Sequence, residues 1–220
     1  MATTYLTKTL SGSPTDSNKW TWSAWVKRGK LTTEQVLFFA DDGGTSYYGR
    51  IQWHDTDSLS FRNKYASTNS GYAVTTAKFR DIFGWYHIVC VLDTSNSTAG
   101  DRMILYVNGE RITAFDTFTA IDQNAGSTIN DGYQHRIGVG NATSGTSFFD
   151  GSMTHVHFCD GQAYAASDFG ETDATTGEWK IKTSPSVTYG TNGFFILKDG
   201  NSVTDQSGNS NNFTLAAGTL

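Results

Sequence analysis

The residues best suited to chemistry are aromatic and polar side chains that alternate between positions 47 and 65. Aromatic rings can stack on the apolar face of a sugar while amide and guanidinium groups bond its hydroxyls. Gln52 and Lys64 belong to the same stretch. The alternative is that Trp53 and Tyr65 pack inside the protein. The pattern predicts a shallow carbohydrate-binding site formed by Tyr47, Tyr48, Arg50, Trp53, Asn63 and Tyr65.

Asp41 and Asp42, which precede two glycines, are calcium candidates. Hard cations bind several oxygen atoms on a flexible turn. Asp and Gly are also favoured in ordinary turns for backbone reasons alone, and the sequence offers no matched ligands elsewhere. We therefore expect no required cofactor, with calcium as the candidate ion.

His155 and His157 are two residues apart in a strand-like run, so both should leave the same face of a strand. Paired imidazoles can hold a transition metal, but such a site needs further ligands. No third ligand has a suitable spacing, and we expect an ordinary polar strand face here.

Hydrolysis of a glycosidic bond needs two carboxylates, about 5–5.5 Å apart for retention or about 6.5–9.5 Å for inversion. No strand-like run carries acidic residues on one face at suitable spacing. Glu171, Asp173 and Glu178 form the nearest group, in a Gly- and Thr-rich segment that reads as a loop. The sequence therefore predicts no catalytic residues, and we expect a protein that is not an enzyme.

A three-stranded meander over residues 85–115 organises the chain. It begins with the apolar run 85–93, continues through 103–107 and turns at Asn108 and Gly109. Asn-Gly is favoured in the type I′ turn that joins two antiparallel strands. The run 19–26 predicts a strand in the middle of a sandwich, and 50–54 with 58–64 predicts an antiparallel pair.

The remaining signals favour one all-β domain over residues 1–220. The chain has 23 Gly, only 2 Pro and 14% aromatic residues, which suits many short strands joined by glycine turns. Residues 170–190 read as a loop. Residues 194–198 and 212–215 predict a last strand pair, which places 190–220 near the N-terminal strand. The expected class is an antiparallel two-sheet jelly-roll sandwich.

The charge and hydropathy of the sequence restrict the kinds of partner that we expect. The net charge is −5 and only residues 27–30 are basic as a group, which argues against nucleic acid. No run approaches the ~18 apolar residues of a membrane span, so no membrane insertion is expected. The first residues lack the pattern of a secretory signal, so we expect a soluble protein made in the cytoplasm. Cys90 and Cys159 lie in apolar runs as buried thiols, and a disulfide between them is left open.

Several motifs in one order resemble a known family. They are WTWSAWVKRG at 20–29, WYHIVCVLD at 85–93, LYVNGE at 105–110, RIGVG at 136–140 and FDGSMTHVHFCDGQAY at 149–164. Together they resemble laminin-G-like, concanavalin A-like jelly-roll domains, and are most similar to those in structural proteins of marine tailed bacteriophages. A segment like DQSGNSNNFTL stands before the tryptophan-bearing strand in many relatives and comes last here, so we expect the two chain ends to lie side by side.

This resemblance implies a non-catalytic recognition module of a virion, assembled in the host cytoplasm and placed on a tail fibre or the capsid surface. Its expected partners are a host surface glycan, other virion proteins and further copies of itself. The alternative is a structural decoration or assembly module that binds other virion subunits. A weaker alternative is a glycoside hydrolase, since the superfamily includes such enzymes.

Overall fold

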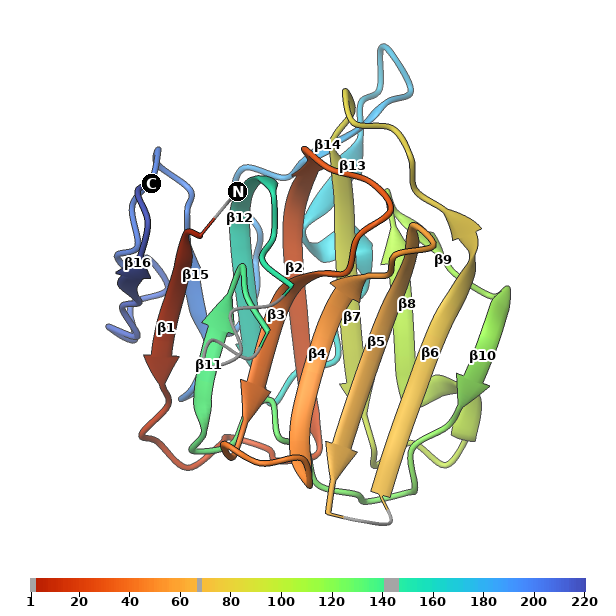
Figure 1. The fold of residues 1–220 in the computed structure, drawn as a ribbon, viewed down its shortest axis with the longest axis vertical. Coiled ribbons are helices and arrows are strands. Elements are labelled where there is room, and N and C mark those ends of the chain that lie inside the picture. Colours follow the sequence, from red (N-terminus) through yellow and green to blue (C-terminus); the bar gives the residue numbers. More distant parts are fainter. Residues whose placement is uncertain (1–2, 67–68, 141–146) are drawn as a thin grey trace.

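Two antiparallel β-sheets lie face to face, one in front of the other in Figure 1, and the core lies between them. The computed structural model describes residues 3–66, 69–140 and 147–220, so the predicted domain of 1–220 includes a few residues outside the described part. One sheet has eight strands and the other has six. This arrangement confirms the predicted all-β, two-sheet class.

Both sheets combine strands from distant parts of the chain. In spatial order, the eight-stranded sheet runs β10 (Phe115–Thr119), β6 (Asn69–Lys78), β5 (Ser58–Tyr65), β4 (Tyr47–Trp53), β3 (Gln35–Asp41), β11 (Gln134–Ile137), β1 (Tyr5–Thr9) and β16 (Thr214–Ala217). The six-stranded sheet runs β15 (Phe194–Ile196), β12 (Gly151–Asp160), β2 (Lys19–Arg28), β7 (Tyr86–Asp93), β8 (Met103–Val107) and β9 (Glu110–Arg111). A separate hairpin contains β13 (Gly170–Thr172) and β14 (Trp179–Ile181), and two 3₁₀ turns are η1 (Ala99–Asp101) and η2 (Ala166–Asp168).

The predicted meander is confirmed as β7, β8 and β9, which pair in sequence order. Its third strand is shorter than predicted, because β9 ends at Arg111 and Phe115 begins β10 in the other sheet. Asn108 and Gly109 both have positive φ, 50° and 88°, as the type I′ turn requires. β2 lies between β12 and β7, which confirms its predicted central position.

The core lies between the two sheets and is rich in aromatic rings. Trp20 and Trp22 alternate with polar residues on β2 and point inward. The Trp20 ring meets Phe61 edge-on at 5.3 Å between centroids, and Trp22 stacks on Phe38 at 5.9 Å. Burying a side chain such as Phe38 is worth about 2 kcal/mol, so these contacts hold the two sheets together.

Both cysteines are buried free thiols. Cys90 lies in the core between the sheets, whereas Cys159 belongs to a second apolar cluster with Val89 and Phe169. Burial raises the pKa of both thiols, so both are poor nucleophiles in the folded protein.

The predicted C-terminal strand pair is wrong, because its two strands belong to different sheets. β15 pairs with β12, whereas β16 pairs with β1. The first and last strands therefore lie side by side (Figure 1). The expected loop at 170–190 is also wrong in part, since it contains the β13–β14 hairpin. No helix in the described part of the chain is long and apolar enough to cross a membrane.

Candidate functional site

A buried ion pair anchors the turn between β4 and β5. The carboxylate of Asp57 accepts hydrogen bonds from Arg28 (3.1 Å), Arg80 (3.0 Å) and the backbone amide of Thr32 (2.9 Å). Burial alone would raise the pKa of Asp57, but the Thr32 amide and the two guanidinium groups outweigh it and hold that pKa below its usual range. Asp57 is therefore ionised and holds the turn in one conformation.

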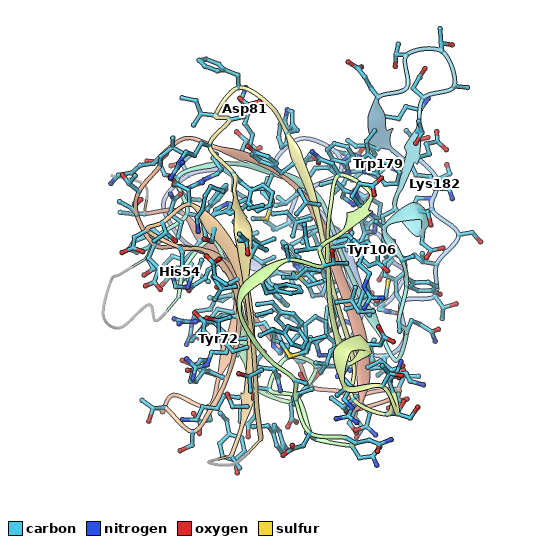
Figure 2. The ribbon with its side chains drawn as sticks, turned by 90° about the vertical axis from the view of Figure 1, so that its right-hand side faces the viewer. His54, Tyr72, Asp81, Tyr106, Trp179 and Lys182 are labelled. Carbon is cyan, nitrogen blue, oxygen red and sulfur yellow. The ribbon has the colours of Figure 1, made fainter. Side chains whose placement is uncertain are left out.

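This turn sets the register of β4 against β5. Tyr48 lies opposite Lys64, and Arg50 lies opposite Arg62. On the next strand, Tyr72 lies opposite Arg62. Side chains alternate between the two faces of a strand, so these five residues share the face that points away from the core. We call them the arginine–tyrosine face, and Figure 2 shows Tyr72 on this side of the molecule with His54.

Cations surround the ring of Tyr48. The guanidinium carbon of Arg62 lies 5.2 Å from its centroid, and Arg50 and Lys64 each lie 5.8 Å away. Arg62 also lies 5.1 Å from the ring of Tyr72. Cations at this distance interact favourably with a π face. The two tyrosines are thus held as a partly exposed aromatic platform with charged groups beside it.

Tyr72 carries a protonated hydroxyl on this platform. Burial raises its pKa, although Arg50 and Arg62 oppose the change. Its oxygen lies 3.0 Å from Nε2 of His54. The phenol is therefore available as a hydrogen-bonding group at neutral pH.

Polar atoms without partners lie beneath this platform. Gln52 and Ser60 are opposite one another and fully buried. Nε2 of Gln52 donates to Glu34 at 2.7 Å, but its Oε1 and the hydroxyl of Ser60 have no hydrogen-bond partner within the described chain. The same holds for Nε of Arg50, Arg62 and Arg136. Buried polar groups are usually satisfied, so these enclosed atoms are exceptions, and they have no contact with solvent through which a ligand could reach them.

The face is positively charged although the chain carries a net charge of −5. Its cations are Arg50, Arg62 and Lys64. Within the described residues, these three cations form one ion pair, between Arg50 and Glu34 at 3.8 Å. The neighbouring Arg136 is neutralised by a 2.9 Å ion pair. A local excess of cations attracts anionic groups.

The structure brings together only part of the predicted site. Tyr48 and Arg50 belong to the arginine–tyrosine face. Trp53 is fully buried in the core, where Phe79 lies 5.5 Å away, so it cannot stack on a ligand and its prediction is wrong. Asn63 is also wrong as a ligand-binding residue, because it is buried and its amide bonds Gly126 and Ser127.

Tyr47 and Tyr65 lie on the core side of the sheet, near its end. Their rings meet edge-on at 5.1 Å, and Tyr47 lies 6.2 Å from Tyr133. The ring of Tyr65 packs directly on Gly126, where an added Cβ would come within 2.6 Å. The two tyrosines therefore do not join the outward-facing platform.

The calcium candidates are engaged elsewhere. The carboxylate of Asp41 is buried and paired with Arg136 at 2.9 Å. Asp42 accepts a hydrogen bond from the amide of Gly44 at 2.8 Å, as in an ordinary turn. A guanidinium in contact with Asp41 opposes binding of a dication there.

The histidine pair shares the outer face of the six-stranded sheet as expected, with both rings beside Phe195 at 5.9 Å and 3.9 Å between centroids, although β12 has a bulge between Thr154 and His157. His155 has a φ of 49° within this bulge, and His157 is buried and bonded to Tyr189 at 2.9 Å. Across the described residues, no group of three or more His, Cys, Asp or Glu side chains could hold a metal.

Arg62 and Tyr72 were missed by the sequence prediction. The sequence could have predicted Arg62. If the strands 50–54 and 58–64 pair on either side of their turn, position 62 lies opposite position 50. Tyr72 depends on the register of β6, which has no short turn signal of its own.

Comparison with known proteins places this geometry in a family. A model of the concanavalin A-like lectin/glucanases superfamily, of the laminin G type, matches residues 2–168. No curated protein is significantly similar to the chain in sequence.

Three solved structures share the fold at low sequence identity. A candidate carbohydrate-binding protein from Bacteroides ovatus matches at TM-score 0.65 and 15% identity over 98% of this chain and 56% of its own. A heptameric SAP-like pentraxin from Limulus polyphemus matches at TM-score 0.54 and 15% identity, over 90% of this chain and 86% of its own. Domains LG4-5 of the mouse laminin α1 chain match at TM-score 0.51 and 9% identity, over 88% of this chain and 44% of their own. The chain thus spans about half the length of two of these proteins.

The family model covers well over half of the 220 residues, and the two antiparallel sheets agree with it. The chain belongs to the concanavalin A-like lectin/glucanases superfamily.

Proposed function

We propose that this chain is a non-catalytic carbohydrate-binding module that holds an acidic sugar on the arginine–tyrosine face. The observation that carries this proposal is the cluster of Arg50, Arg62 and Lys64 around the ring of Tyr48. A sugar ring can pack against the phenol, and its carboxylate can accept charge-assisted hydrogen bonds from the guanidinium groups.

The partly exposed Tyr72 supports the same ligand class. Its protonated hydroxyl can donate a hydrogen bond to a sugar hydroxyl or accept one from it. The fold shared with a candidate carbohydrate-binding protein from Bacteroides ovatus is consistent with this role.

The environments of Asp173 and Asp41 favour binding over hydrolysis at these two positions. A glycosidase needs a carboxylic acid whose pKa is raised so that it can protonate the leaving group. Lys180 and the amides of Thr176 and Thr175 instead hold the pKa of Asp173 below its usual range. Asp41 is tied to Arg136. Neither carboxylate suits a general acid.

A glycan array with the purified chain tests the proposal. We expect binding to sialylated or uronic-acid-containing glycans, and a loss of about 10- to 100-fold in the Arg62→Ala variant, because one charge-assisted hydrogen bond is worth about 1.5–3 kcal/mol. Arg111→Ala is the matched control, since Arg111 is a half-exposed, paired arginine on the other sheet. Equal losses in both variants, or binding of neutral glycans alone, would contradict the proposal.

A second candidate is an assembly module. Phe118 on the edge strand β10 is 37% exposed and lines a cavity of about 420 Å³ with Ile112 and Phe115. Exposed apolar groups on an unpaired edge favour association with other chains. This alternative predicts oligomers in light scattering that Phe118→Asp disrupts, and a monomer at all concentrations would contradict it.

The bacteriophage setting is a proposal that rests on the sequence motifs alone. In it the module lies on a tail fibre or the capsid surface of the virion, forms a homo-oligomer, contacts other virion proteins and meets a host surface glycan. Antibodies raised against the purified chain should then label phage particles in electron micrographs, and unlabelled particles would contradict this setting.

A further inference from the structure

A groove lies on the opposite side of the molecule from the arginine–tyrosine face. The β13–β14 hairpin packs over the outer face of the six-stranded sheet, and a groove of about 990 Å³ remains beside it. Trp25, Trp85, Trp179 and His155 are among the residues that line it. We call it the tryptophan groove. Figure 2 shows Trp179 on the side away from His54 and Tyr72.

The indole of Trp179 is held in one position. Its Nε1 donates to Nδ1 of His87 at 2.9 Å. The His87 ring lies between Trp25 and Trp179, with centroids 4.9 Å and 5.9 Å away. Burial lowers the pKa of His87 to about 3, so the imidazole is neutral and its Nδ1 accepts this hydrogen bond at physiological pH.

Two glycines complete the support for Trp179. An added Cβ would come within 2.8 Å of its ring at Gly109 and within 2.5 Å at Gly170. Gly109 also has a positive φ of 88°. The ring is therefore packed against bare backbone on β13 and on the turn of the meander. A fixed ring loses little entropy when a ligand binds.

His155 is presented to the groove by a strained backbone. It lies in the β12 bulge with a φ of 49°, which is uncommon for a non-glycine residue. Bulges often redirect a side chain next to a binding site. Thr154 engages Nδ1 of His155 at 3.0 Å, which leaves Nε2 for another partner. Burial and nearby Lys198 lower the pKa of His155, so its ring is neutral at physiological pH.

The rim of the groove combines an exposed ring with polar groups. Trp85 is 41% exposed, which is unusual for so large an apolar side chain. Asn108 and Thr154 offer an amide and a hydroxyl nearby. Aromatic platforms with convergent hydrogen-bonding groups suit ligands that have both an apolar face and hydroxyls.

The charge around this groove is the reverse of that on the arginine–tyrosine face. Lys180 pairs with Asp173 at 2.9 Å and with Glu171 at 3.7 Å. Glu178 adds a third carboxylate at the groove. These three carboxylates outnumber the ammonium of Lys180, and Lys198 near His155 is offset by Asp199. The local charge is therefore negative, which disfavours an anionic ligand.

We propose that the tryptophan groove is a second binding site and takes a neutral sugar. The sugar ring stacks on the exposed face of Trp85 or Trp179, while Asn108 and Nε2 of His155 bond its hydroxyls. The carboxylates beside the groove exclude acidic sugars. This site goes beyond the proposed function, because it differs from the arginine–tyrosine face in its residues, its charge and its ligand.

The test is a titration followed by the indole N–H signals in ¹⁵N-correlated NMR spectra. The probes are cellotetraose, maltotetraose and mannotetraose, each at about 10 mM, which is tenfold above a Kd of about 1 mM. We expect at least one probe to shift the Trp85 and Trp179 signals, and Trp85→Ala to weaken its binding about tenfold through the lost stacking surface. Phe83→Ala is the matched control, since Phe83 is 83% exposed in the same loop and does not line the groove.

Three results would overturn the proposal. They are the absence of shifts with every probe, equal weakening by Trp85→Ala and Phe83→Ala, and equally strong shifts with the acidic 3′-sialyllactose. Arg62→Ala separates the two sites, because it should leave the indole shifts unchanged. Neutral-sugar binding that Arg62→Ala abolishes would also refute a separate groove site.

Discussion

Replacing Asp57 with Asn removes the charge that holds the β4–β5 turn. Asn keeps the size of the side chain and tolerates the left-handed backbone at this position, where φ is 64°. The change leaves Arg28 fully buried without its carboxylate. Breaking a buried pair in this way costs about 3–5 kcal/mol. We take about 3 kcal/mol, because the Asn oxygen still accepts one hydrogen bond.

A loss of this size is readily measured. For a chain of this length, 1 kcal/mol shifts Tm by about 2–4 °C, so Asp57→Asn should lower Tm by about 6–12 °C. Differential scanning calorimetry at pH 7 measures this change in Tm. Asp55→Asn is the matched control, because Asp55 lies in the same turn with its side chain 72% exposed, and its contact with His54 should contribute little.

The pH dependence gives the sign of the effect. The folded-state pKa of Asp57 is held below its usual range, so its contribution to stability is present above the unfolded-state pKa of about 3.9. That contribution is lost as the pH falls through the folded-state pKa. The gap in Tm between wild type and Asp57→Asn should therefore narrow in acid. The reasoning is refuted if Asp57→Asn and Asp55→Asn unfold at the same temperature at pH 7.

Three further predictions test the assignments of buried residues. Trp53→Ala should cost about 3–5 kcal/mol in the free energy of unfolding by urea, because the ring lies in the core; a loss below about 1 kcal/mol would contradict that placement. Burial lowers the pKa of His87 to about 3 and that of His135 to about 4. The stability of the protein should therefore be constant above about pH 6.5 and should fall as the pH drops towards those values. Urea midpoints that rise over this acid range would refute the prediction. Cys90 and Cys159 should react with a thiol reagent only at the rate of unfolding, and rapid labelling of the native protein would show that either is accessible.

Local patterns in the sequence predicted much of the fold. The Asn108-Gly109 turn predicted the meander, and the apolar run at 85–93 predicted its first strand. The alternation on β2 likewise predicted a strand buried on both faces. Each of these signals involves neighbours in the sequence, so no long-range information was needed.

The candidate site was predicted only in part, because the predicted residues alternate between the two faces of β4 and β5. Tyr48 and Arg50 are an even number of positions apart and share the outer face, whereas Trp53 is an odd number from Tyr48 and must face the core. The turn register then places Asn63 opposite Gly49 on the inner face.

The C-terminal strands and the tryptophan groove depend on contacts between distant segments. β16 pairs with β1 across nearly the whole chain, and β15 joins the other sheet. The groove needs the 170–181 hairpin to dock on the six-stranded sheet and a bulge at His155 to redirect its ring. The spacing of apolar and polar residues in the sequence does not predict these strand pairings or the docking of the hairpin.

The most direct test of the proposed function follows the arginine side chains during a titration with 3′-sialyllactose. The Nε–H groups of Arg50, Arg62 and Arg136 have no acceptor within the described chain, so their signals in ¹⁵N-correlated NMR spectra report a ligand on the arginine–tyrosine face. We predict that the Arg50 and Arg62 signals shift with saturation, and that lactose, which lacks the carboxylate, causes smaller shifts. Saturable binding that leaves both signals unmoved, or no binding at all, would contradict the account.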